Sequence, residues 1–210
     1  MKKAKSIRDL YYVIALSLLV AIGAYGYVAS AGDRRHQAAI GEIERFGGRV
    51  AHSEANPDMP ALEVDFRFGE ITDSGLVHLE KLTSLQRLLL ASTQVTDAGL
   101  IHLRKLTSLR TLFLNNTRVT DAGLVHLTGL TDLNALRLGS TQITDQGLVH
   151  VKELTGLEHL EVDSTQVTDA GLVHLEELTG LRSLNLQYTQ ITDEGIENLK
   201  QALPNCRIRR

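Results

Sequence analysis

The sequence of 210 residues contains one cysteine, three prolines and no tryptophan, and aromatic residues make up only 4% of it. The single cysteine, Cys206, excludes a disulfide within the chain, and a core must be built from aliphatic side chains. The formal net charge of -3 gives no general attraction for nucleic acid. The sequence also lacks a phosphate-binding loop, a nucleophile motif and a dinucleotide-binding fingerprint. We therefore expect no enzyme, no cofactor and no small-molecule substrate.

A short phrase of the form (V/I)TDxG(L/I) occurs six times at a constant interval of 24 residues, without insertion or deletion. It begins at Ile71, Val95, Val119, Ile143, Val167 and Ile191. Repeats of this length are typical of solenoids, in which each unit buries its apolar face against its neighbours. A function is therefore expected on the surface of a stack of repeats.

The second unit shows the local structure expected of each repeat. Leu88 and Leu90 alternate with Leu89, so the pattern predicts a short strand with two leucines facing the core and Leu89 facing the opposite side. Thr96 and Asp97 suit the start of a helix, since either side-chain oxygen can accept a hydrogen bond from a free backbone N–H. Leucines three residues apart then turn one face of a short helix inward.

The full unit, LxxLxxLxLxxTx(V/I)TDxGLxxL, resembles the leucine-rich repeat family. It is most similar to the ribonuclease-inhibitor-like type of F-box substrate receptors and of membrane-anchored bacterial repeat proteins. The resemblance implies an α/β solenoid with a parallel β-sheet on the concave side and short helices on the convex side. The ladder position, usually Asn or Cys in the family, is threonine in five units and Gly69 in the first. The threonines are Thr93, Thr117, Thr141, Thr165 and Thr189, and Thr141 in a central unit is expected to bond buried turn backbone through its hydroxyl.

The stretch from Leu10 to Gly32 contains 23 residues without a charge. As a helix it would be about 34 Å long, enough to cross a hydrocarbon core of about 30 Å. Tyrosines near both ends suit the membrane interfaces, and the basic residues before it favour a cytoplasmic N-terminus. We therefore predict a single-pass membrane protein with its repeats exported to the periplasm or cell envelope. The alternative is a signal peptide cleaved at Ala29-Ser30-Ala31, which would release the repeats as a secreted protein.

These patterns divide the chain into five segments. They are a cytoplasmic N-terminus (1–9), a transmembrane helix (10–32), a juxtamembrane helix with an N-terminal cap (33–60), the repeats (61–203) and a final half-strand (204–210). In the cap, Ala39, Ile43 and Phe46 share one helical stripe, which is expected to cover the open end of the stack. At the other end, Arg207 to Arg209 are expected to form the half-strand, because Ile208 follows Leu184 by 24 residues.

Two groups of residues are candidates for metal or acid–base chemistry. One histidine per unit is expected on the outward side of the helices, namely His78, His102, His126, His150 and His174. Helices are about 10 Å thick, which separates successive histidines too far for chelation. We interpret this row as a solvated position copied with the repeat, with a pH-responsive or metal-responsive surface as the alternative. His159, Glu161 and Asp163 alternate along one strand and are interpreted as polar binding surface, with a metal site as the alternative.

The strand positions that face away from the core vary from unit to unit, whereas the core positions are nearly constant. Such variation is typical of a binding surface, and a scaffold held by identical lateral contacts would not need it. We predict a protein-binding site on the concave face, centred on an exposed apolar pair, Leu89 and Phe113. The predicted partner-binding residues are Arg87, Leu89, Phe113, Asn115, Arg137, His159, Glu161, Asp163, Asn185 and Tyr188. The alternative for the apolar pair is that the N-terminal cap covers it or that the chain merely tolerates it.

Three functional classes follow from these observations. The leading one is a membrane-tethered module that binds a protein partner of unknown identity. The second is a structural part of the cell envelope that needs no specific partner. The third, by family analogy alone, is a substrate receptor of the F-box type. The third is disfavoured because the membrane span and the short cap in residues 1–60 leave no room for an F-box.

Overall fold

The computed structural model describes residues 31–51 and 62–210. The predicted transmembrane helix lies outside these residues except for Ala31 and Gly32, which begin helix α2 (Ala31–Arg45). The alternative cleavage site likewise lies outside them apart from Ala31. No helix within the described ranges combines the length and the apolar composition needed to cross a membrane. Of the two compact units of the chain, the second, Ala39–Arg210, contains all the repeats.

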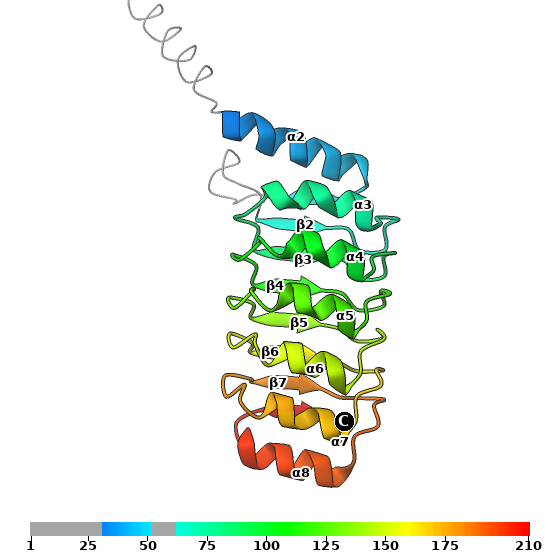
Figure 1. Cartoon of the computed structure of the whole chain (residues 1–210), viewed down its shortest axis with the longest axis vertical. Helices are drawn as coiled ribbons and strands as arrows, with labels where there is room; N and C mark the ends of the chain where they lie inside the picture. Colours follow the sequence, from blue (N-terminus) through cyan, green and yellow to red (C-terminus); the bar gives the residue numbers. More distant parts are fainter. Residues whose placement is uncertain (1–30, 52–61) are drawn as a thin grey trace, which may run out of the picture. The chain divides into compact units, whose positions relative to one another are not determined.

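Eight short strands form one sheet in the order of the chain. They are β1 (Arg49–Ala51), β2 (Glu63–Asp65), β3 (Arg87–Leu89), β4 (Thr111–Phe113), β5 (Ala135–Arg137), β6 (His159–Glu161), β7 (Ser183–Asn185) and β8 (Arg207–Arg209). Every pair from β2 to β8 is parallel and joins residues 24 apart, as Leu88 and Leu112 do. Figure 1 shows these strands stacked in chain order. Strand β8 occupies the place of the expected half-strand, whereas β1, which runs antiparallel to β2, was not predicted.

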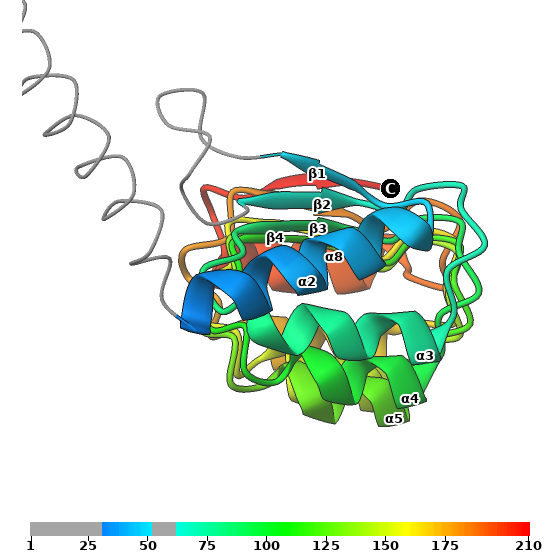
Figure 2. The same cartoon turned by 90° about the horizontal axis from the view of Figure 1, so that it is seen from above.

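Each repeat returns to the next strand through a helical segment on the other side of the sheet, as Figure 2 shows for α3 to α5. Most segments are one α-helical turn followed by a 3₁₀ turn, labelled η. The pairs are α3 (Asp73–Leu76) with η1 (Val77–Lys81), α4 (Asp97–Leu100) with η2 (Ile101–Leu103), α5 (Asp121–Leu124) with η3 (Val125–Leu127), and α7 (Asp169–Leu172) with η4 (Val173–Leu175). Two helices are longer, α6 (Asp145–Val151) and α8 (Asp193–Ala202). The chain is thus an α/β solenoid with parallel strands and short helices.

Aliphatic side chains from strands and helices form one continuous core. The strand leucines Leu88 and Leu90 are fully buried, as the alternating pattern predicted. Ala39 and Ile43 of α2 belong to the same core and cover its N-terminal end. Phe46, expected on that stripe, is instead 40% exposed and lies against the ring of His78 at 5.8 Å. The reason is that α2 ends at Arg45, so Phe46 falls in the turn that follows the helix.

The ladder threonines satisfy turn backbone inside the stack, which confirms the role predicted for Thr141. The Thr141 hydroxyl donates to the carbonyl oxygen of Leu138 at 2.5 Å, and the hydroxyls of the other four donate to the residue three positions earlier at 2.6 to 2.7 Å. Four of the five are buried, with Thr189 in the last unit part-buried. Because a buried polar group must be paired to avoid a desolvation cost, the threonine hydroxyl stabilises these five units; in the first unit the N–H of Gly69 donates to the equivalent carbonyl, that of Phe66.

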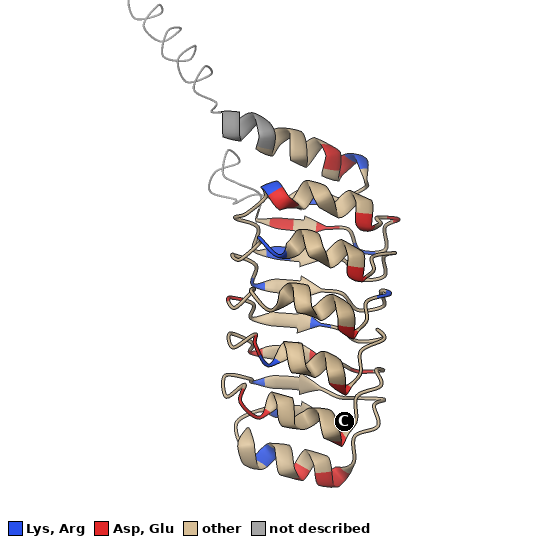
Figure 3. Ribbon diagram, viewed as in Figure 1, with Lys and Arg blue, Asp and Glu red and all other residues tan. Residues whose placement is uncertain are grey.

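The TDxG phrase joins each unit to the next. The Thr120 hydroxyl accepts a hydrogen bond from the N–H of Ala122 and so caps its own helix. The Asp97 carboxylate does not cap its own helix; it accepts from the N–H of Thr120 at 2.8 Å and from the Thr120 hydroxyl at 2.6 Å, one unit later. Four further aspartates make the same pair of bonds, namely Asp73, Asp121, Asp145 and Asp169. Figure 3 shows acidic residues recurring at one end of the stacked helices.

The glycine of the phrase makes room for that aspartate. A Cβ atom on Gly99 would lie 2.5 Å from Oδ1 of Asp73 in the preceding unit, closer than van der Waals contact allows. The later units repeat the arrangement, and the first does not, because no aspartate precedes it and Gly75 instead faces Ile71. The Thr, Asp and Gly of the phrase therefore all take part in one contact between neighbouring units.

Candidate functional site

The sheet brings the variable strand positions of successive units into rows on the face turned away from the helices, which we call the concave face. Phe113 pairs in register with Leu89 on one side and with Arg137 on the other, and Arg137 pairs with Glu161. Adjacent strands lie about 4.8 Å apart. These four side chains therefore follow one another across β3 to β6.

The structure overturns the expectation that Leu89 is exposed. Its side chain is only 2% exposed, although it points to the concave side, whereas Phe113 is half-buried. Leu89 lies between Asp65 and Phe113 in register, and both flanks of a side chain in such a row are shielded by its neighbours. Ala91, at the next concave position of the same unit, is also buried at 5% exposure. Phe113 and Arg137, and not Leu89, therefore form the centre of the exposed surface.

Phe113, Arg137 and Glu161 form a cluster that we call the concave triad. The guanidinium carbon of Arg137 lies 4.1 Å from the centre of the Phe113 ring, a cation–π contact. Its Nε lies 3.3 Å from Oε2 of Glu161. Arginine held at both ends loses little further freedom when a partner docks on it, which suits an interface anchor.

A hollow of about 290 Å³ opens beside the concave triad. It lies over Ala135, whose methyl group leaves space between Thr111 and His159 at the neighbouring register positions. Its wall is made by the triad together with His159 and Ser183. The hollow combines an aromatic ring, both charges and a hydroxyl, so it can accept a side chain of a bound protein.

The remaining predicted residues lie around this centre. Arg87 pairs with Glu63 at 3.2 Å, and the Asn185 amide nitrogen donates to Asp163 at 3.1 Å. The amide oxygen of Asn115 is buried and accepts no hydrogen bond from the described residues. Tyr188, expected on the concave face, lies instead in the turn after β7.

Tyr188 is 84% exposed and has a φ of 57°. Four of the equivalent turn positions hold Ser or Asn, which tolerate a left-handed conformation, and the first holds Phe68. The turn places Tyr188 outside the strand, because β7 ends at Asn185.

No group of three or more potential metal ligands converges among residues 31–51 and 62–210. The histidine row is half-buried, so it is less outward-facing than predicted. His102 bonds through Nδ1 to Oε1 of Glu80 at 2.6 Å, and this bond lowers the pKa of Glu80. The residues before the histidines are more exposed and form an apolar row that the sequence analysis missed; among them are Val77, Ile101, Val125 and Val173, 39% to 55% exposed.

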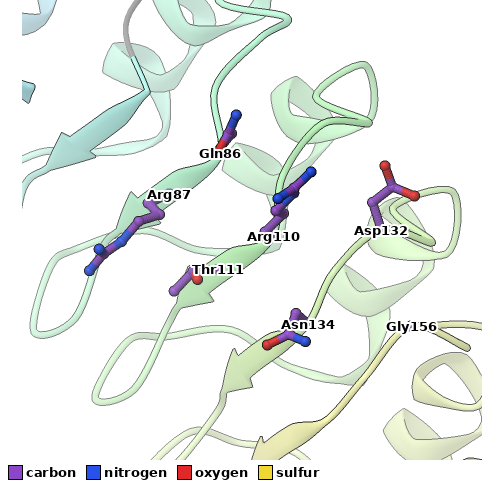
Figure 4. Close-up of a pocket in the computed structure, with 7 residues that line it drawn as sticks. All are labelled: Gln86, Arg87, Arg110, Thr111, Asp132, Asn134 and Gly156. Carbon is purple, nitrogen blue, oxygen red and sulfur yellow. The ribbon is translucent and has the colours of Figure 1, made fainter. Parts of the chain in front are cut away.

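A second hollow, of about 470 Å³, lies where β3, β4 and β5 begin. Figure 4 shows Gln86, Arg110 and Asn134 at these strand starts, with Asp132 and Gly156 on the adjoining loops. Arg87 and Thr111 also line it, and Figure 4 shows Arg87 and Arg110 pointing in different directions. Of the residues that line this hollow, only Arg87 belongs to the predicted binding residues.

Comparison with known proteins agrees with this architecture. The family model described as leucine-rich repeats (2 copies) matches residues 83–126, and that described as leucine-rich repeat matches residues 177–200. No curated protein matches the chain. The chain is a leucine-rich repeat protein.

Two similar solved structures are internalins of Listeria monocytogenes. Internalin C2 is 26% identical with a TM-score of 0.52, over 70% of this chain and 69% of that chain. Another internalin, inlF, is 23% identical with a TM-score of 0.54, over 81% of this chain and 54% of its own length. The chain thus spans about half of the inlF structure, and this second likeness concerns the fold alone.

Proposed function

We propose that the repeats bind a protein partner through the concave face, with the concave triad and its hollow as the centre of the site. The observation that carries the proposal is the contrast between the two sides of each strand. Core leucines recur in every unit, while the register row that contains the triad changes from acid to leucine to phenylalanine to arginine to acid. A surface of individual character is what recognition of one partner requires.

We also propose that residues 10–32 tether the repeats to a membrane and that the repeats lie outside the cytoplasm. The support is the uncharged 23-residue stretch with basic residues before it. Fusing a reporter after Arg210 and fractionating the cells tests both parts. Activity of a cytoplasm-specific reporter would contradict the orientation, and recovery of the chain in the soluble fraction would contradict the anchor.

The binding site is tested with a photo-crosslinking amino acid placed in the full chain in cells. His159 is exposed and lines the hollow, whereas Val173 is exposed on the helical side. We expect a discrete adduct from position 159 and none from position 173. Phe113→Ala should weaken the adduct at 159, whereas Phe68→Ala, which removes an 81% exposed ring in the first turn, should not.

The row of exposed valines and isoleucine on the helices favours a second function, a structural part of the cell envelope that uses identical lateral contacts. The same experiment separates the two. Adducts between copies of this chain from position 173, with none from position 159, would contradict concave binding and support the structural function.

A further inference from the structure

Arginines on the strand side of the repeats are paired with carboxylates. The pairs are Arg67 with Asp65 at 2.8 Å, Arg87 with Glu63 at 3.2 Å, Arg137 with Glu161 at 3.3 Å and Arg182 with Glu158 at 3.0 Å. Arg110, just before β4, makes no ion pair with any described residue. It occupies the same repeat position as Arg182. The two arginines therefore differ in ion pairing because their neighbouring residues differ.

Arg110 stands between two amides where Arg182 has an acid. The backbone N–H of Arg110 donates to the carbonyl of Gln86 at 2.8 Å, and the N–H of Asn134 donates to the carbonyl of Arg110 at 2.8 Å. These bonds hold the three residues side by side at the starts of β3, β4 and β5. For Arg182, the equivalent bond is to Glu158, whose carboxylate also neutralises the guanidinium. Arg110 thus has amide neighbours where Arg182 has a carboxylate, and no described carboxylate lies within ion-pair distance of its guanidinium.

The hollow in front of Arg110 has room for a ligand group. One part of its floor is Gly156, whose missing side chain is required because a Cβ there would collide with the carbonyl oxygen of Thr131. Its lining adds the amides of Gln86 and Asn134 and the hydroxyl of Thr111, which can all donate hydrogen bonds. A guanidinium with nearby amide and hydroxyl donors is suited to a carboxylate.

Asp132, which also lines the hollow, favours a singly charged anion over a polyanion. Its exposed carboxylate repels a densely charged polyanion such as nucleic acid or a sulfated polysaccharide. The net charge of -3 acts in the same direction. A single carboxylate, such as an acidic side chain on a protein, carries one charge, so Asp132 repels it less than it repels a polyanion.

We propose that an acidic side chain of the protein partner enters this hollow and pairs with Arg110, so that the segment bound at the starts of β3 to β5 is acidic. This inference rests on the proposed function and names the chemistry of the partner at one edge of the site. It makes Arg110 a specificity-determining residue that lies outside the concave triad.

The test uses the full-length chain in detergent micelles and a fluorescein-labelled decapeptide that alternates glutamate and serine. Fluorescence anisotropy measures its affinity, with the glutamine–serine peptide as the uncharged reference. We expect Arg110→Gln to weaken binding of the glutamate peptide about fivefold, the upper range for an exposed ion pair. Asp132→Asn should strengthen binding, and the reference peptide should bind neither variant better than the other.

Arg118→Gln is the matched control, because Arg118 is also exposed and unpaired among the described residues but lies outside the hollow. It changes the net charge by the same amount and should leave the affinity unchanged. Equal losses in both variants, no measurable binding to the unaltered chain, or tighter binding of single-stranded DNA that depends on Arg110 would each overturn the inference. The crosslinks from position 159 test the proposed function separately, so failure of the peptide experiment would not contradict the proposed function.

Discussion

Because Asp121 bonds to the following unit, replacing it should lower the free energy of unfolding more than an ordinary surface substitution does. Its two carboxylate oxygens accept from the N–H of Thr144 at 2.8 Å and from the Thr144 hydroxyl at 2.6 Å. Asp121→Ala removes both and leaves the Thr144 N–H without this acceptor. A hydrogen bond to a charged group contributes about 1.5 to 3 kcal/mol, but this pair is only part-buried, so we expect a total loss of about 2 to 3 kcal/mol.

The chain contains a matched control for this substitution. Asp193 occupies the same position of the phrase in the last unit, its side chain is 98% exposed, and it pairs only with Arg210. Because Asp193 has no following Thr to hold, Asp193→Ala should cost about 0.5 kcal/mol or less. Urea unfolding followed by circular dichroism, with the free energy taken from the midpoint and slope, measures both. If Asp121→Ala costs no more than Asp193→Ala, the bridging role of the aspartate is wrong.

The glycine supplies a second test of the same contact. Alanine is the better helix former by about 1 kcal/mol, so Gly147→Ala would be stabilising on an isolated helix. Here the added Cβ would collide with Oδ1 of Asp121, and we expect a net loss of about 1 to 2 kcal/mol. In the double variant with Asp121→Ala that collision is gone, although Ile143 Cγ2 remains at 2.9 Å. The double loss should therefore be smaller than the sum of the single losses; strict additivity would contradict the packing argument.

Three further predictions concern single residues, with urea unfolding as the measurement. Thr141→Val keeps the shape but leaves the Leu138 carbonyl unpaired, so it should cost about 1 to 3 kcal/mol, and an unchanged midpoint would contradict the ladder role. Leu89→Ala should cost about 2 to 4 kcal/mol because the side chain is buried, whereas a loss below about 0.5 kcal/mol would show that it is exposed. Hydrogen bonds from the side chain and then the backbone of Thr192 lower the pKa of Asp169, so this carboxylate adds stability above its ordinary pKa of 3.8 that is lost as the pH falls through the lower folded value. Thr192→Val should reduce this loss between pH 5 and about pH 2, and an identical pH dependence in both proteins would refute the cause.

Much of the fold was predictable because every repeat carries the same pattern of apolar and polar residues. The 24-residue interval fixes which residues become neighbours, and the alternating leucines fix which side of each strand is buried. The threonine ladder was predictable for a physical reason too, since a polar side chain at a constant buried position must have a backbone partner. Strand β1 was not, because it lies outside the repeats and its three residues carry no alternation of apolar and polar side chains.

Three of the errors originate in contacts between units. Asp97 was predicted to act in its own helix, since a perfect repeat cannot distinguish a bond within a unit from the equivalent bond to the next unit. Leu89 was expected to be exposed because alternation gives the direction of a side chain and not the size of its neighbours on other strands. Arg110 was missed for the same reason: its character depends on Gln86 and Asn134, each 24 residues away.

The constant positions of the repeat stabilise the stack, whereas the variable positions are available for binding. The repeated leucines, threonines and aspartates are occupied by contacts inside a unit or between adjacent units, so they cannot change without loss of stability. Positions free of these contacts lie on the concave face and at the strand starts, and there the sequence differs from unit to unit. Arg110 differs from Arg182 only in the residues of the neighbouring units, so a single change such as Gln86→Glu would supply the missing counter-charge. Arginine occurs at this repeat position only in Arg110 and Arg182, and only Arg182 has an acid beside it; this contrast is the observation on which the proposed acidic partner rests.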